Sequence, residues 1–131
     1  MIELNKENID LLFNKAIIEI NENKAYEINN LTDLNNLKFS RQNGIVYLIL
    51  VNNKIRYIGK SKGIYFRERI KNHFIEPNKG TKSKNDFIVR ERRCEKSVTL
   101  KFIELKPEAL RNLIEEILIE KYKNLNLWNY S

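Results

Sequence analysis

The sequence predicts an α+β fold in which a small antiparallel sheet is covered by helices. Three observations lead to this prediction. The 131 residues are enough for one hydrophobic core but not for two. An uncharged apolar run is followed at once by a turn signal and a second short apolar segment, which is typical of a hairpin. Helical periodicity occurs on both sides of that pair, so the expected order is helix, strand, strand, helix, a short second helix, strand and helix.

The N-terminal third is expected to be helical. Residues 5–24 have an apolar stripe at helical spacing, made by Ile9, Leu12, Phe13, Ile17 and Ile20. Residues 29–43 are rich in asparagine and lack a clear period, so they are expected to form a connection. We therefore divide the chain into an N-terminal helical extension, residues 1–43, and a domain over residues 44–131.

The first two strands are expected at residues 44–51 and 54–58. The first run is uncharged and apolar on both faces, which is typical of a central strand. Asn52-Asn53 is a turn signal because asparagine tolerates positive φ. Residues 59–63 are expected to form a small-residue loop.

The second half is expected to add two helices, a third strand and a last helix. Phe66, Ile70 and Phe74 repeat every four residues, which predicts a helix over 65–75 with these side chains in the core. A lysine-rich loop over 76–86 and a weakly patterned helix over 86–95 should follow. A strand over 97–105 is expected next, and Pro107 suits the first turn of the last helix.

The charge distribution favours an anionic partner. The net charge of +7 comes from one block, residues 54–93, which has thirteen basic and four acidic residues. A single cysteine and a single histidine exclude a Cys/His zinc site and a disulfide framework, which fits a reducing compartment. No apolar run approaches the roughly 18 residues of a membrane span. We expect a cytoplasmic protein without a membrane partner.

Five short motifs follow one another along the chain. They are Gly44-Ile45-Val46-Tyr47, Tyr57-Ile58-Gly59, Arg69 with His73 four positions later, Glu115 on the last helix, and Leu127-Trp128-Asn129. In this order they resemble the motifs of the GIY-YIG nuclease superfamily. The resemblance covers residues 44–131, about two-thirds of the chain.

The resemblance implies a fold, a reaction and a set of site residues. It implies a three-stranded antiparallel sheet flanked by helices, and phosphodiester hydrolysis with one divalent cation, Mg²⁺ or Mn²⁺. Its catalytic positions fall on Tyr47, Tyr57, Arg69, His73, Glu115 and Asn129. Glu115 would hold the metal, the tyrosines would lie beside the phosphate and the attacking water, and Arg69 would stabilise the phosphate. His73 would assist proton transfer and Asn129 would support the site.

Three assignments keep an alternative. Arg67 stands at the commoner distance from Tyr57, but only Arg69 is followed by histidine at the fourth position; the extra residues are expected around Gly63-Ile64. Periodicity does not separate Glu115 from Glu116, and only the family spacing selects Glu115. Asn126 is a rival for the asparagine position.

The first tyrosine position raises a question of strand register. A two-residue turn at Asn52-Asn53 would put Tyr47 and Tyr57 on opposite faces and bring Val46 to the face of Tyr57. A three-residue loop with a bulge would pair Tyr47 directly with Tyr57. We adopt the second geometry, because the first would leave the site without one tyrosine.

The expected function is a metal-dependent DNA endonuclease of restriction or mobile-element type, acting on double-stranded DNA as a monomer or a homodimer. The alternatives are an impaired nucleic-acid-binding module on the same fold and an RNA-processing nuclease. Phosphate contacts are expected from basic residues of the charged block. These are Lys60, Lys62, Arg67, Lys79, Lys82, Lys84, Arg90 and Arg93.

Overall fold

The computed structural model describes residues 1–2 and 5–130. The elements are α1 (Lys6–Glu22), α2 (Leu31–Asn35), β1 (Gly44–Val51), β2 (Lys54–Lys62), α3 (Gly63–Phe74), α4 (Lys82–Arg93), β3 (Val98–Leu105), α5 (Leu110–Tyr122) and a short 3₁₀ turn, η1 (Trp128–Tyr130). The three strands form one antiparallel sheet in the order β2-β1-β3. The predicted α+β class, with a helix before the domain, is confirmed.

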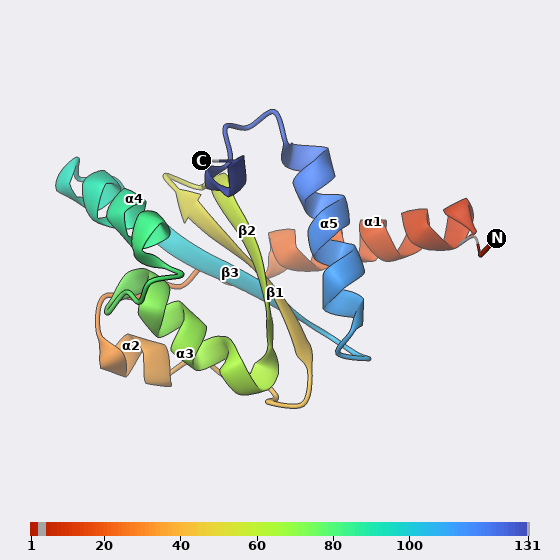
Figure 1. The fold of residues 1–131 in the computed structure, drawn as a ribbon, viewed down its shortest axis with the longest axis horizontal. Helices are drawn as coiled ribbons and strands as arrows, with labels where there is room; N and C mark the ends of the chain where they lie inside the picture. The colour runs from red at the N-terminus through yellow and green to blue at the C-terminus, as the bar shows by residue number, and fades with distance from the viewer. Residues whose placement is uncertain (3–4, 131) are drawn as a thin grey trace.

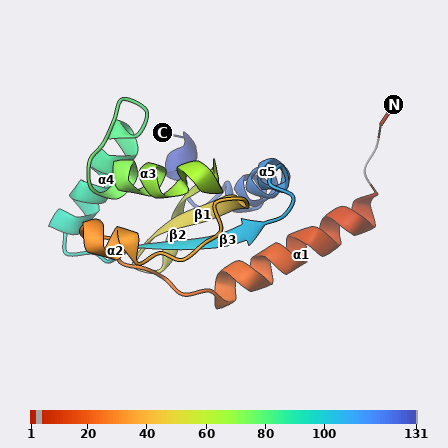
Figure 2. The same ribbon diagram turned by 90° about the horizontal axis from the view of Figure 1, so that it is seen from below.

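The sheet separates two hydrophobic clusters. One face of β1 packs Tyr47 and Ile49 against residues of α2, α3 and α4. The other face packs Val46 and Leu48 against residues of α1 and α5. Figure 2 shows α3 and α4 on one side of the sheet and α1 on the opposite side. Every residue of β1 is buried, as its uninterrupted apolar sequence predicts for a central strand.

The hairpin between β1 and β2 differs from the predicted one. Asn52 and Asn53 form a two-residue turn with φ values of 50° and 66°, and Val51 pairs with Lys54. A register shift follows, because Ile49 pairs with Tyr57 and Leu50 pairs with Ile55. The bulged residue is therefore Arg56, in the return strand and not in the loop.

The expected loop over 59–63 does not form. β2 continues to Lys62 and α3 begins at Gly63. An added Cβ at Gly63 would lie 2.5 Å from the carbonyl oxygen of Ser40, so this direct strand-to-helix junction requires glycine. α4 also begins four residues earlier than expected, at Lys82. Gly63 and Ile64 therefore belong to α3. The two additional residues between Tyr57 and Arg69 lie within β2 and α3 and not in a loop.

Both edges of the sheet have a partner outside the sheet. On β3, Tyr26 forms an isolated bridge with Leu100, with backbone hydrogen bonds of 2.8 Å in both directions. On β2, the carboxamide of Asn129 accepts from the backbone N–H of Ile58 at 3.0 Å and donates to its carbonyl at 2.7 Å. The 3₁₀ turn thus closes the β2 edge (Figure 1). The first 43 residues also supply side chains to both clusters, among them Ala16, Ile20, Ile28 and Leu34.

Candidate active site

The centre of the site is the hydroxyl of Tyr47, which is fully buried. It lies 2.9 Å from Nε2 of His73 and accepts a hydrogen bond of 3.1 Å from Nε of Arg69. When His73 carries its proton on Nδ1, the Tyr47 O–H donates to Nε2. The three side chains form one hydrogen-bonded chain from Arg69 through Tyr47 to His73. Its members come from β1 and from two positions of α3 one turn apart.

Burial keeps both ends of the Tyr47–His73 hydrogen bond neutral. Burial, with the nearby Tyr57, raises the pKa of Tyr47 well above its ordinary value. Burial, with the charges of Arg69 and Lys84, lowers the pKa of His73 to about 3. A neutral His73 that accepts at Nε2 carries its proton on Nδ1, and that atom is buried without a hydrogen-bond partner among the described residues.

Tyr57 joins this group because of the bulge. The extra residue in β2 returns Tyr57 to the face of Tyr47, since Ile49 and Tyr47 lie two positions apart on β1. The ring of Tyr57 lies 6.2 Å from that of Tyr47 and 5.5 Å from that of His73. The expected direct pairing of the two tyrosines is wrong, because Tyr47 pairs with Gly59.

Gly59 is required by this arrangement. A Cβ at that position would lie 2.4 Å from Cζ of Tyr47. The ring of Tyr47 crosses over the neighbouring strand at Gly59 to reach His73. Val46, the other candidate for the tyrosine position, packs on the opposite face with Ile103 and Ile114. It is Tyr47 and not Val46 that lies beside His73.

A cleft of about 630 Å³ opens beside this group, between β2, α3, the loop before α4, and α5. Arg69 and Glu115 both line it, as does Lys60, whose Nζ lies 3.5 Å from the Glu115 carboxylate. Burial raises the pKa of Glu115 above its ordinary value, although Lys60 opposes the rise. Glu116 is exposed and does not line the cleft. The cleft thus distinguishes Glu115 from Glu116, which the helical periodicity of the sequence did not.

The donor set of the cleft fits a hydrated Mg²⁺ better than a fully ligated metal. Glu115 provides a half-buried carboxylate, and Glu68 lines the same cleft. The described residues contain no group of three or more His, Cys, Asp or Glu side chains that could hold a metal ion. Mg²⁺ keeps several waters and needs only one or two carboxylates, whereas zinc needs a fuller set of protein ligands. Any cation held by Glu115 would compete with Lys60.

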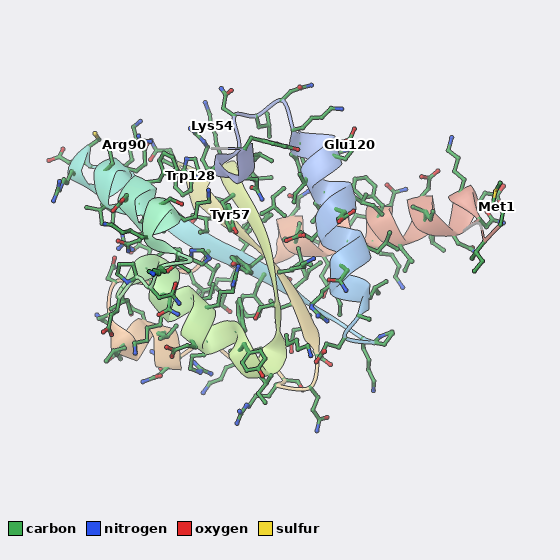
Figure 3. All side chains as sticks on the ribbon, viewed as in Figure 1. Met1, Lys54, Tyr57, Arg90, Glu120 and Trp128 are labelled. Atoms are coloured by element: carbon green, nitrogen blue, oxygen red, sulfur yellow. The ribbon has the colours of Figure 1, made fainter. Side chains whose placement is uncertain are left out.

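Asn129 supports the site without lining the cleft. Its two hydrogen bonds to the backbone of Ile58 hold β2 next to Tyr57. Its rival Asn126 is exposed and has a φ of 56°, so it serves a turn. Figure 3 shows Tyr57 and Trp128 at the same end of the sheet. Lys84 connects them, because its ammonium donates to the Trp128 carbonyl at 2.7 Å and lies 5.8 Å from the Tyr57 ring.

The eight basic residues expected to contact phosphates lie in three different places in the structure. Lys60 and Lys62 line the cleft. Arg67 does not reach it: its guanidinium donates to the carbonyls of Leu34 and Leu37, which ties the N-terminal segment to α3. The remaining five lie between α3 and the end of α4, and the exposed ones among them are Lys79, Lys82, Arg90 and Arg93.

Two charged residues of the cleft, Glu68 and Arg111, were not among the site residues predicted from the sequence. Arg111 lines the cleft and donates to the backbone carbonyl of Glu108 at 3.0 Å. It stands four positions before Glu115 on α5, so the two share a helix face. That spacing could have identified it as a second cation beside the candidate metal site.

The comparisons agree with the geometry. A family model described as the GIY-YIG catalytic domain matches residues 43–130, which is about two-thirds of the chain. A search of curated proteins and a search of solved structures found no match. The family match runs from one residue before β1 to the end of η1, and so includes every residue of the site described above.

Proposed function

Because the chain belongs to the GIY-YIG family, whose model covers most of its length, we propose that it is a metal-dependent endonuclease that hydrolyses phosphodiester bonds in DNA. The observation that carries this proposal is the chain of hydrogen bonds from Arg69 through Tyr47 to His73, beside a cleft that also contains Glu115. Any buried tyrosine hydroxyl needs hydrogen-bond partners, but here the partners are an arginine that lines the cleft and a histidine.

Arg69 is suited to bind the phosphate that is attacked. One of its five N–H groups is used by Tyr47, and the side chain lines the cleft. The remaining N–H groups can donate to two phosphate oxygens and stabilise the charge that develops in the transition state. Arg111 and Lys60 add positive charge to the same cleft.

Tyr47 is suited to relay a proton rather than to act as a resting tyrosinate, because its raised pKa keeps it neutral. Its hydroxyl lies 2.9 Å from Nε2 of His73, and in the tautomer with the proton on Nδ1 a proton taken from the attacking water could pass along this hydrogen bond. His73 is a poor base at rest because its pKa is about 3. A phosphate bound at Arg69 would offset the guanidinium charge that contributes to this low value, and so raise the basicity of His73.

Glu115 is the residue that would hold the metal, with Lys60 released to meet a phosphate. A bound divalent cation supplies Lewis-acid stabilisation of the charge on the phosphate and leaving oxygen. The charge of residues 54–93 favours a nucleic-acid backbone as the partner, and double-stranded DNA of a restriction or mobile-element system is our preferred substrate. A single site cuts one strand at a time, so a double-strand break made in one binding event would suggest two copies of the chain.

The test is cleavage of supercoiled plasmid by the purified protein, with Mg²⁺ or with EDTA. We expect nicked or linear plasmid only with Mg²⁺. Glu115→Gln should abolish cleavage, while Glu116→Gln, its exposed neighbour outside the cleft, should cut like the wild type. A wild-type protein that cuts no DNA but cuts structured RNA would support the RNA-processing alternative, and one that binds DNA without cutting would support the binding-module alternative.

A further inference from the structure

A second pocket, of about 430 Å³, lies at the other end of β2 from the cleft and shares no lining residue with it. Cations and aromatic rings line this pocket together: Arg56, Phe87, Arg90, Lys123, Trp128 and Tyr130. Among the residues that the structure describes, none of those lining the pocket is acidic. Arg90 and Lys123 do meet carboxylates outside the pocket, at 3.3 Å and 2.6 Å.

The bulge in β2 creates the floor of this pocket. It leaves Arg56 without a paired residue in β1 and puts its guanidinium 6.0 Å from the Trp128 ring. Two buried donors are left without a hydrogen-bond partner among the described residues, Nε of Arg56 and Nε1 of Trp128. Unmade hydrogen bonds of buried donors cost free energy, and both residues line the pocket.

Only one ring of the pocket is open for stacking. Trp128 is 2% exposed, and its ring stacks on Phe87 with centroids 5.1 Å apart. The Arg90 guanidinium lies 4.8 Å from the Phe87 ring. Tyr130, by contrast, is 62% exposed. An exposed tyrosine beside three cations has the composition of sites that stack one base and hold its phosphate.

We propose that this pocket binds one unstacked nucleotide of the DNA substrate, with its base on Tyr130 and its phosphate between Arg56, Arg90 and Lys123. The inference rests on the proposed function, since it takes its ligand from the same nucleic-acid strand. Arg56 precedes Lys60 by four positions on β2, roughly 13 Å of strand.

The pocket contains its own probe, because Trp128 is the single tryptophan of the chain. We would titrate the 131-residue protein with hexathymidylate in EDTA and follow the fluorescence of Trp128. Tyr130→Ala should weaken binding by about fivefold or more, the range for losing one stacked base, and Tyr130→Phe should keep it. Arg56→Gln should also weaken binding and reduce its salt dependence. Lys15→Gln, a charge change at an exposed position of α1, is the matched control.

The outcomes separate this inference from the proposed function. Loss of binding in Tyr130→Ala, with normal binding in Tyr130→Phe and Lys15→Gln, supports the pocket even if the protein cuts no plasmid. No fluorescence change with the wild type overturns it even if plasmid is cut. Equal binding of an abasic hexamer overturns the stacking of a base. Equal weakening by Lys15→Gln and Arg56→Gln would mean diffuse charge attraction and would also overturn it. Far-UV circular dichroism of each variant checks that it is folded.

Discussion

The two faces of the sheet are built from alternate residues of the same strand, and they differ in almost every other respect. The face of Val46 is aliphatic and packs against α1 and α5. The face of Tyr47 carries aromatic rings, a buried histidine and the polar contacts of the candidate site. Among the described buried side chains that leave a polar atom without a partner, His73 and Trp128 lie on the second face, whereas Thr99, which pairs with Leu50, lies on the first.

This difference indicates a division of roles. An aliphatic face gains stability from apolar burial and close packing, and Thr99, which pairs with Leu50, is the described residue that leaves a buried hydroxyl without a partner there. The Tyr47 face contains buried polar atoms without hydrogen-bond partners and a histidine that burial keeps neutral. Both lower the free energy of unfolding, and reactive sites commonly contain such groups. Neighbouring residues of β1 should therefore respond in opposite ways to substitution, with activity lost on one face and stability on the other.

The largest expected effect is on the rate at the Tyr47 face. Tyr47→Phe keeps the ring but removes the hydroxyl that joins Arg69 to His73. We expect plasmid cleavage to slow by about 10²–10⁴-fold, the range for loss of a proton-transfer group. The free energy of unfolding should change by only about 1–3 kcal/mol, because two donor or acceptor atoms lose their partner. Cleavage at the wild-type rate would remove Tyr47 from the mechanism.

The neighbouring residue on the other face should show the reverse. Val46 is fully buried among aliphatic side chains. Val46→Ala should lower the free energy of unfolding by about 2–3 kcal/mol, from lost burial and a small cavity. Its cleavage rate per folded molecule should stay near that of the wild type. Urea unfolding and plasmid cleavage, measured below the unfolding transition, test both parts. A large loss of rate in the folded variant would contradict the division between the faces.

The buried histidine should make stability depend on pH. The folded-state pKa of His73 is about 3, against an ordinary value of 6.5, so the unfolded chain takes up the proton first. The stabilisation is therefore complete above pH 6.5 and is lost as the pH falls toward 3. Between pH 7 and pH 5 the loss should be roughly 2 kcal/mol.

The measurement is urea unfolding of the wild type and of His73→Gln at the two pH values. The variant should lack this part of the pH dependence, whatever its stability at pH 7. Parallel curves for the two proteins would show that His73 is not held neutral in the folded state.

The smallest expected effect concerns the ion pair of the cleft. Lys60 lies 3.5 Å from Glu115 and is partly exposed, so the pair contributes at most about 1 kcal/mol. Lys60→Gln should strengthen Mn²⁺ binding by up to about fivefold, measured without DNA by electron paramagnetic resonance. Lys15→Gln, which removes a cation from an exposed position of α1 outside the cleft, is the control and should leave Mn²⁺ affinity unchanged. Weaker Mn²⁺ binding by Lys60→Gln would mean that the lysine assists the metal site.

Strong local patterns determined much of this protein from the sequence alone. The charge-free run of β1, the turn at Asn52-Asn53 and the apolar stripe of α3 predicted a hairpin and a helix, since each depends on residues close in the chain. The order of the motifs predicted the family, which the match over residues 43–130 confirms. The same motifs predicted that Arg69 and His73 share one helix face.

Only the tertiary structure decided how these elements combine. The bulge at Arg56 depends on packing along the whole hairpin, and without it Tyr57 would face away from Tyr47. The choice of Glu115 over Glu116 depends on which side of α5 meets the cleft, and the ion pair with Lys60 joins two distant segments. Local pattern fixes the elements because it acts through neighbours in sequence. The site depends on register and packing between elements, and those are properties of the folded chain.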